Sequence, residues 1–203
     1  ERMESEPAVA PAEKRYGFLA VCAGEGLATA FRDLGVDRIV SGGQTMNPST
    51  EDILHAAEQV PAMDVYVLPN NKNIVMAAEQ AARLARTSGV RRIHVVPTTT
   101  IPQGISAMMA YDESAEIKDN VEAMQEAASR VQSGSVTFAA RDSDYDGHQI
   151  KEGEPLALEN GKVAFTGTDL GSVTAKVAKD LMQEDSQFIT LLYGADVSEE
   201  QAA

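Results

Sequence analysis

Cysteine, tryptophan and long apolar runs are what this 203-residue sequence has least of. It contains one cysteine, Cys22, and no tryptophan, and aromatic residues make up 5% of the chain. A single cysteine excludes an internal disulfide framework and fits a reducing compartment, so we expect a cytoplasmic protein. No apolar run approaches the ~20 residues that a membrane-spanning helix needs, and membrane insertion is therefore not expected.

Positive charge is also scarce. The sequence has 17 Lys and Arg residues against 31 Asp and Glu residues, which gives a net charge of -14. Such a surface repels phosphate backbones and anionic lipid headgroups, so we expect no nucleic-acid partner. Hydrophobic residues make up 43%, which is typical of a globular protein with one sizeable domain or two small subdomains.

The common sequence motifs of catalysis are missing. Neither GxGxxG nor the Walker A pattern occurs, so the sequence gives no support for nucleotide binding. GxSxG is absent as well, and no nucleophile and base stand out as a pair. Cys22 ends an apolar run, which favours a packed core thiol over a nucleophile. We therefore predict no catalytic residue in this chain.

Metal-binding patterns are equally weak. The three histidines, His55, His94 and His148, are scattered, whereas zinc ligands come in clusters. The alternating acids at 142, 144 and 146 resemble part of a calcium loop, but the downstream glutamate is missing, which favours a solvated hairpin turn. We expect neither a metal nor a cofactor in this chain.

After a Glu-, Pro- and Ala-rich linker at residues 1–14, the first half alternates between short apolar runs and helical patterns. This order with short connections predicts an α/β fold in which helices flank a parallel sheet, here a subdomain over residues 15–133. The predicted strands are 16–22, 38–41, 64–68 and 92–96. The predicted helices are 25–34, 50–60, 73–87, 102–111 and 114–131.

The second half changes character and predicts a smaller α+β subdomain over residues 134–203. Asp146-Gly147 and Asn160-Gly161 are both typical of two-residue hairpin turns. They indicate antiparallel hairpins, after a strand at 135–141. A helix at 169–182 and a last strand at Gln187–Tyr193 (QFITLLY) complete the prediction.

Polar loops follow all four strands of the predicted parallel sheet. The carboxyl ends of such strands share one edge, where α/β proteins bind ligands, and glycines and helix N-termini there favour an anion or a carboxylate. Tight turns need the same residue types, so this alternative stays open for each loop. The candidates for ligand or partner binding are Ser41, Gly42, Gly43, Gln44, Thr45, Asn47, Ser49, Asn70, Asn71, Lys72, Asn73, Thr98, Thr99 and Gln103.

Four segments carry a resemblance to a known family. SGGQTMNPSTEDIL, LPNNKNI, VPTTTIPQG and SGSVTFAARDSDYDG resemble the C-terminal region of the ATP-binding subunit of bacterial fatty acid kinases, a dihydroxyacetone kinase-related family. The resemblance runs from Tyr16 to Gly194 and implies a DegV-like fold. It also implies that the segment from Gln44 to Ser49 is a variant of the turn by which carrier proteins hold a fatty acid carboxylate.

The resemblance further implies a longer parent protein. That parent would bind ATP and magnesium in an N-terminal helical domain, form a homodimer, and phosphorylate a fatty acid held by a separate DegV-like carrier, for phospholipid synthesis. The present chain lacks the nucleotide domain, so we expect no enzyme activity from it alone. It also stops soon after Gly194, where the family region continues through another βα unit and a final strand.

Two functions remain open on this basis. The first is a non-catalytic domain of the kinase that docks the fatty acid carrier protein or supports dimerisation. The alternative is a ligand-binding module that holds a fatty acid carboxylate or a small anion at the strand edge. An independent hydrolase or transferase is the weakest hypothesis, because no nucleophile–base pair is apparent. Lys72 could meet a ligand, a partner carboxylate or solvent.

Overall fold

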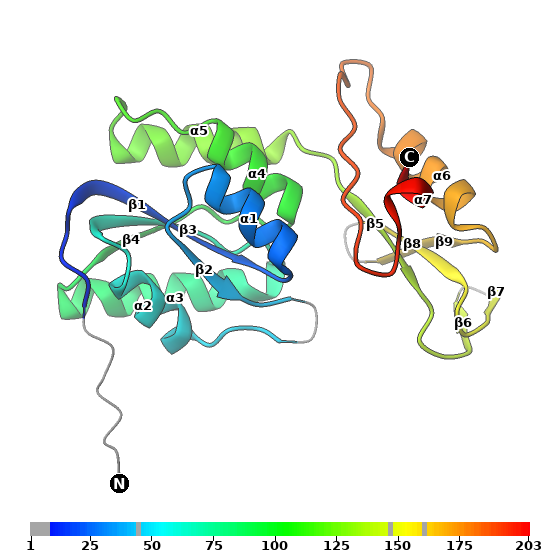
Figure 1. Cartoon of the computed structure of the whole chain (residues 1–203), viewed down its shortest axis with the longest axis horizontal. Helices are drawn as coiled ribbons and strands as arrows, with labels where there is room; N and C mark the ends of the chain where they lie inside the picture. Colours follow the sequence, from blue (N-terminus) through cyan, green and yellow to red (C-terminus); the bar gives the residue numbers. More distant parts are fainter. Residues whose placement is uncertain (1–8, 44–45, 146–147, 160–161) are drawn as a thin grey trace, which may run out of the picture. The chain divides into compact units, whose positions relative to one another are not determined.

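The structure is a computed structural model that describes residues 9–43, 46–145, 148–159 and 162–203 (Figure 1). Its internal contacts divide the chain into two compact units, Glu1–Val131 and Gln132–Ala203. We call these the first and second units. Each has its own sheet and its own apolar core.

The first unit is built on a four-stranded sheet in the order β2-β1-β3-β4. All three pairings are parallel, which confirms the predicted α/β fold. The central strands are nearly continuous apolar runs, as expected for strands that are covered on both faces. The strands are β1 (Lys14–Cys22), β2 (Arg38–Ser41), β3 (Ala62–Leu68) and β4 (Arg92–Val95).

Helices cover both faces of this sheet (Figure 1). Alternate residues of β1 point to opposite faces: Phe18 packs with α1, α4 and α5, and Leu19 packs with α2 and α3. The helices are α1 (Glu25–Asp33), α2 (Thr50–Glu58), α3 (Lys72–Ser88), α4 (Ile101–Met109) and α5 (Ile117–Ser129).

The helices of the first unit begin and end where the sequence predicts them to within a few residues. Ser49 and Asp52 form the predicted capping box at the start of α2. α3 ends at Gly89, which has the left-handed conformation that favours glycine. Small alanines on the buried face of α3 allow the helix to lie close to the sheet.

The second unit contains small antiparallel sheets, as predicted. A three-stranded sheet has the order β5-β8-β9, and a separate hairpin pairs β6 with β7. The turns Asp146-Gly147 and Asn160-Gly161 lie outside the described residues. The elements are β5 (Gly134–Phe138), β6 (Ser143–Tyr145), β7 (His148–Ile150), β8 (Pro155–Glu159), β9 (Lys162–Thr166), α6 (Leu170–Leu181) and α7 (Glu199–Ala202).

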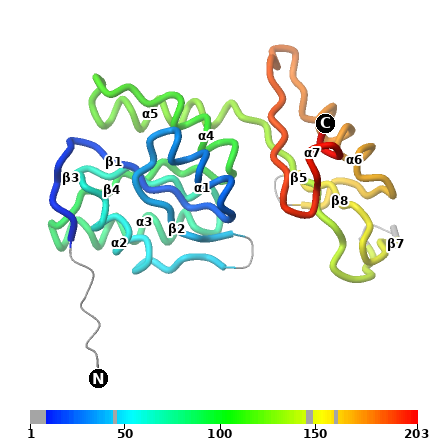
Figure 2. The backbone as a smooth tube through the Cα atoms, viewed as in Figure 1, coloured from blue at the N-terminus to red at the C-terminus, as the bar shows by residue number. Residues whose placement is uncertain are grey.

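The predicted last strand, Gln187–Tyr193, is wrong for this structure. The segment has no regular secondary structure and runs exposed between α6 and α7 (Figure 2). Its β-branched and aromatic residues favour a strand, but a strand forms only where a neighbour supplies a hydrogen-bond ladder. No such ladder reaches this segment among the residues that the structure describes.

Every helix in the described part of the chain is too short or too polar to cross a bilayer.

Candidate functional site: the carboxyl edge of the parallel sheet

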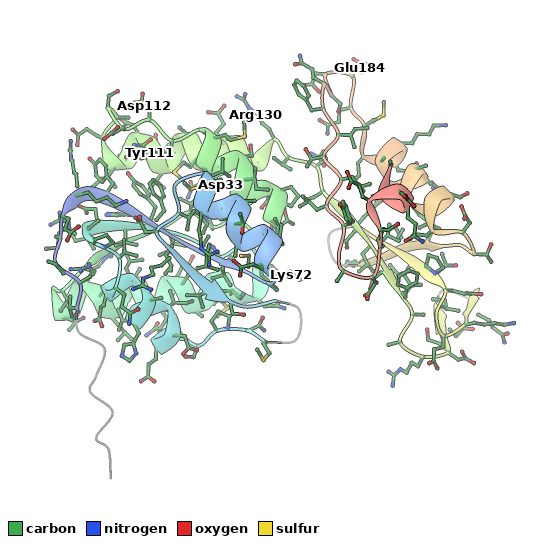
Figure 3. All side chains as sticks on the ribbon, in the orientation of Figure 1. Asp33, Lys72, Tyr111, Asp112, Arg130 and Glu184 are labelled. Carbon is green, nitrogen blue, oxygen red and sulfur yellow. The ribbon has the colours of Figure 1, made fainter. Side chains whose placement is uncertain are left out.

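The predicted site loops meet at the carboxyl edge of the first unit's sheet. The adjacent strands β1 and β3 lead to helices on opposite faces, α1 on one and α3 on the other. This divergence is the topological switch point at which open α/β sheets bind ligands. Figure 3 shows Lys72 at this edge, and Tyr111 and Asp112 at the other end of the unit.

The switch point is occupied by the side chain of Asn70. Its Nδ2 donates to the carbonyl of Val21 at the end of β1, at 3.0 Å. The hydroxyl of Thr98, beyond β4, donates to Asn70 Oδ1 at 2.8 Å and accepts from the Asn70 backbone N–H at 3.1 Å. Both residues are buried. Asn70 and Thr98, predicted to bind a ligand, instead use their polar atoms to tie three strand ends together.

The backbone around Asn70 is fitted to this role. Asn70 has φ 54, and it is the one non-glycine residue with positive φ in the described chain. Asparagine tolerates this conformation better than most residues. Gly104 of α4 lies directly against the Asn70 side chain, since an added Cβ would sit 2.1 Å from Oδ1. Gly104 is thus required by close packing, a role that the sequence analysis did not assign.

The loop after β2 folds back onto the sheet edge. The Gly43 N–H donates to the carbonyl of Met46 at 3.0 Å, and the Gly42 N–H donates to the carbonyl of Cys22 at 3.1 Å. A Cβ on Gly42 would lie 2.7 Å from Pro48 Cδ, so this position needs glycine. Gln44 and Thr45, two further predicted site residues, lie outside the described residues.

An open hollow of about 560 Å³ lies beside this loop. Met46 stands at it with 68% of its surface exposed, and Ser41 and Asn47 are exposed as well. The residues that line the hollow are Val40, Ser41, Met46, Asn47, Pro48 and Asp52. It combines one flexible apolar side chain with hydroxyl, amide and carboxylate groups.

Several predicted site residues are engaged in capping helices. Ser49 accepts from the Asp52 N–H at 3.1 Å, and Asp52 accepts from the Ser49 N–H and hydroxyl at 2.8 Å. These bonds from Ser49 lower the pKa of Asp52. Asn71 caps α3 by accepting from the Asn73 N–H at 2.9 Å.

The loop after β4 is tied in a similar way. Gln103 Oε1 accepts from the Thr99 N–H at 2.8 Å and from its hydroxyl at 3.0 Å. Of the candidates that the structure describes, Ser41, Asn47, Lys72 and Asn73 are the exposed ones whose side chains carry no cap or loop bond in this geometry. A role for them in binding stays a prediction.

A second polar cluster, which the sequence analysis missed, lies toward the opposite edge of the sheet. Arg92 donates to both carboxylate oxygens of Asp64, from Nε at 2.7 Å and from a terminal nitrogen at 2.5 Å. His94 Nε2 lies 2.9 Å from Asp64 Oδ1. Asp64 is buried, and the bond from Arg92 is the main cause that lowers its pKa, against the effect of burial.

Aromatic side chains pack beside this cluster. Phe18 and Tyr66 stack with ring centroids 5.2 Å apart, and Tyr111 meets Phe18 edge-on at 4.8 Å. The hydroxyls of Tyr16 and Tyr66 are buried without a hydrogen-bond partner of normal geometry in the described residues. Burial raises the pKa of Tyr66 to about 12. The sequence signal was the matched alternation of Tyr16 and Phe18 on one strand with polar positions on its neighbours.

The chemistry of the described residues is limited. No group of three or more His, Cys, Asp or Glu side chains gathers there in a way that could hold a metal ion. Cys22 is buried, as predicted, and burial raises the pKa of its thiol, which favours the unreactive protonated form. The polar edge can therefore donate and accept hydrogen bonds, which suits recognition of a partner or a ligand.

Comparison with known proteins identifies the family. Residues 17–203 match the model of the C-terminal domain of FakA-like fatty acid kinases. The chain belongs to this family. It is 41% identical over 202 residues to Protein YloV of Bacillus subtilis, an alignment that covers 98% of this chain and 36% of that protein.

Staphylococcal proteins are similar to the chain as well. An uncharacterized protein of Staphylococcus haemolyticus is 42% identical over 183 residues, with 90% of this chain and 32% of that protein covered. One of Staphylococcus aureus is 39% identical over 182 residues, with the same coverage of 90% and 32%. The chain spans about a third of the length of these curated relatives.

Proposed function

We propose that this chain is a non-catalytic domain of a fatty acid kinase, and that it docks the fatty acid carrier protein through the carboxyl edge of its parallel sheet. In this proposal the full-length protein binds ATP and magnesium in another domain and phosphorylates the carrier-bound fatty acid in the cytoplasm. Membership of the FakA-like C-terminal domain family supports the kinase context.

The open hollow beside the β2 loop is the observation that carries the docking role. Pockets for small molecules enclose most of their ligand, and the space at the switch point is filled by Asn70. The hollow is instead open and shared between Ser41, Met46 and Asn47. An exposed apolar side chain surrounded by polar groups is typical of an anchor residue in a protein interface.

Titration of the chain with a purified fatty acid carrier protein tests this proposal. We expect saturable binding in calorimetry, and a loss of at least tenfold in affinity for Met46→Asp, since removal of an interface anchor costs about 2 kcal/mol or more. Met109→Asp is the matched control. Met109 is 74% exposed and lies at the far end of α4, away from the carboxyl edge.

The two variants separate docking from a general effect of charge. Equal affinity losses in both would show that added negative charge, and not the hollow, governs binding. Unchanged binding in Met46→Asp, or no binding by the unmodified chain, would contradict docking at this edge. Sedimentation equilibrium of the chain alone tests the related role in dimerisation, for which a shift of Met46→Asp toward monomer is the expected result.

The same hollow supports one alternative function, a module that holds a fatty acid carboxylate or a small anion. Gly42 and Gly43 leave backbone open to close approach, and Lys72 is exposed at the start of α3 on the same edge. Native mass spectrometry of the purified chain tests it. A co-purifying fatty acid, with a thermal shift on addition of palmitate, would support the alternative; a ligand-free spectrum without a shift would reject it.

A further inference from the structure

The segment Gln187–Tyr193 in the second unit carries an unusual load of exposed apolar surface. Phe188 is 90% exposed and Ile189 is 67% exposed, and three more large apolar residues follow in the next four positions. Surface residues of this kind normally stand alone, and a contiguous exposed group marks a surface that another element covers. The exposed members are Phe188, Ile189, Leu191, Leu192 and Tyr193.

An open strand edge lies in the same unit. β5 is an edge strand of the three-stranded sheet, and in the described chain it pairs with β8 alone. Its other side offers a row of unpaired backbone N–H and C=O groups, which natural proteins usually cover. Phe138, at the end of β5, is 46% exposed. The edge therefore lacks both a hydrogen-bonding neighbour and apolar cover.

Helix α6 leads the chain toward this edge. It follows β9 but packs over β5 and β8, where Val173 and Val177 join Val136 and Ala157 in one core. Its last turns lie over the first residue of β5, because a Cβ on Gly134 would sit 2.6 Å from Val177 Cγ1 and 3.0 Å from Leu181 Cδ1. The chain thus leaves α6 beside the point where β5 begins.

The chain then reverses direction. The Ser186 N–H donates to the carbonyl of Gln183 at 3.1 Å, and the Ser186 hydroxyl accepts from the Gln183 N–H at 2.9 Å. Residues 182–186 can span about 17 Å, which is more than the roughly 10 Å between packed layers. A strand that starts after this turn at the beginning of β5 would run parallel to β5, as in a βαβ crossover from β9.

We propose that Gln187–Tyr193 is a fourth strand of this sheet, which adds in parallel to the free edge of β5 in the same chain. The segment has the composition of a strand, and its residues alternate between two faces. Phe188 and Leu192 lie on one face with Thr190; Ile189, Leu191 and Tyr193 lie on the other. Pairing covers the β5 edge and removes these side chains from water.

Amide hydrogen exchange measured by NMR on the 203-residue chain tests the pairing. In an edge strand every second N–H points to its neighbour, so we expect protection to alternate along residues 188–193, with protected amides at least 100-fold slower than a random coil. Uniform exchange at random-coil rates would overturn the proposal. Protection that appears only as protein concentration rises would overturn it too, because the occupant of the edge would then be a second copy.

Disulfide trapping tests the orientation independently. In a Cys22→Ala background, Thr137→Cys on β5 is combined with a cysteine at each position from 188 to 192 in turn. We expect one position to give an intramolecular disulfide in high yield, with its direct neighbours far less reactive because their side chains point to the other face. Thr137→Cys with Ser172→Cys, at the start of α6, is the control pair. Equal yields along the scan and in the control, or cross-links between molecules alone, contradict the proposal.

Discussion

The Thr98 hydroxyl and the Asn70 side chain form a closed pair of hydrogen bonds at the carboxyl edge of the parallel sheet. Thr98 donates to Asn70 Oδ1 and accepts from the Asn70 N–H, while Asn70 Nδ2 reaches the carbonyl of Val21. The two loops that follow β3 and β4 are thereby fixed to the end of β1. The switch point of this sheet is a structural joint, and binding is left to the exposed rim beside it.

Thr98→Val removes the hydroxyl while it keeps nearly the same shape. The Asn70 N–H and Oδ1 are then buried without partners, which costs about 1–3 kcal/mol of unfolding free energy. Urea denaturation measures this loss as a lower midpoint at an unchanged slope. Thr99→Val is the matched control, because its bond to Gln103 is exposed and a change within about 0.5 kcal/mol is expected. Equal effects of the two variants would contradict the joint.

Gly104→Ala tests the packing against the same side chain. The new methyl group would overlap Asn70 Oδ1, so we expect a loss of about 1–3 kcal/mol from overpacking. In an Asn70→Gly background the clash is gone, and the same substitution should cost far less. Gly26→Ala in α1, where an added Cβ meets nothing within 4 Å, is expected to be neutral or slightly stabilising. Additive effects of the two substitutions would contradict the contact.

Ser49 separates a capping role from a ligand role. Ser49→Ala removes the cap of α2 and is expected to lower the unfolding free energy by about 1 kcal/mol. Ser49→Asp keeps a side-chain acceptor at this position and should restore most of the stability. If Ser49 acts only as a cap, both variants bind the carrier protein as the unmodified chain does. A selective loss of binding in Ser49→Asp would assign this residue to the interface.

Asp64 predicts an acid-dependent component of stability. The hydrogen bond from Arg92, helped by His94, lowers the pKa of Asp64 in the folded state below its unfolded value. This stabilisation is therefore complete above about pH 4 and is lost as the pH falls through the lowered folded-state pKa. Asp64→Asn should cost about 1.5 kcal/mol near neutral pH, the lower end for charged hydrogen bonds, since the Arg92 side chain is 62% exposed.

Urea midpoints across the acid range measure this effect. The difference between the unmodified chain and Asp64→Asn should shrink as the pH falls from about 6 to about 3. Asp33→Asn, an exposed carboxylate on α1, is the control and should change stability little at any pH. A constant difference across the range would show that the Asp64 charge does not contribute.

The sequence predicted the parallel sheet well because its signals are local. Apolar runs such as the one at Tyr16–Cys22, the cap at Ser49 and the C-terminal glycine at Gly89 each specify an element without distant contacts. The hairpin pairings in the second unit followed from turn chemistry in the same way. Gln187–Tyr193 was wrong because a strand needs a partner edge, and sequence pattern alone does not say where that edge is.

The site was predicted only in outline. The loops do gather at one edge, because parallel strands require it. The use of each side chain depends on contacts between residues far apart in sequence, such as Asn70 with Val21 and Thr98. Composition could not separate these structural amides from exposed ones such as Asn47 and Asn73. The Asp64 cluster was missed because its members lie on separate strands and meet through register.

Calorimetric titration of this chain with a fatty acid carrier protein is the most direct test of its function. Docking predicts saturable binding that Met46→Asp weakens by at least tenfold and Met109→Asp leaves unchanged. An absence of binding with the unmodified, folded chain would contradict the proposed role of the carboxyl edge.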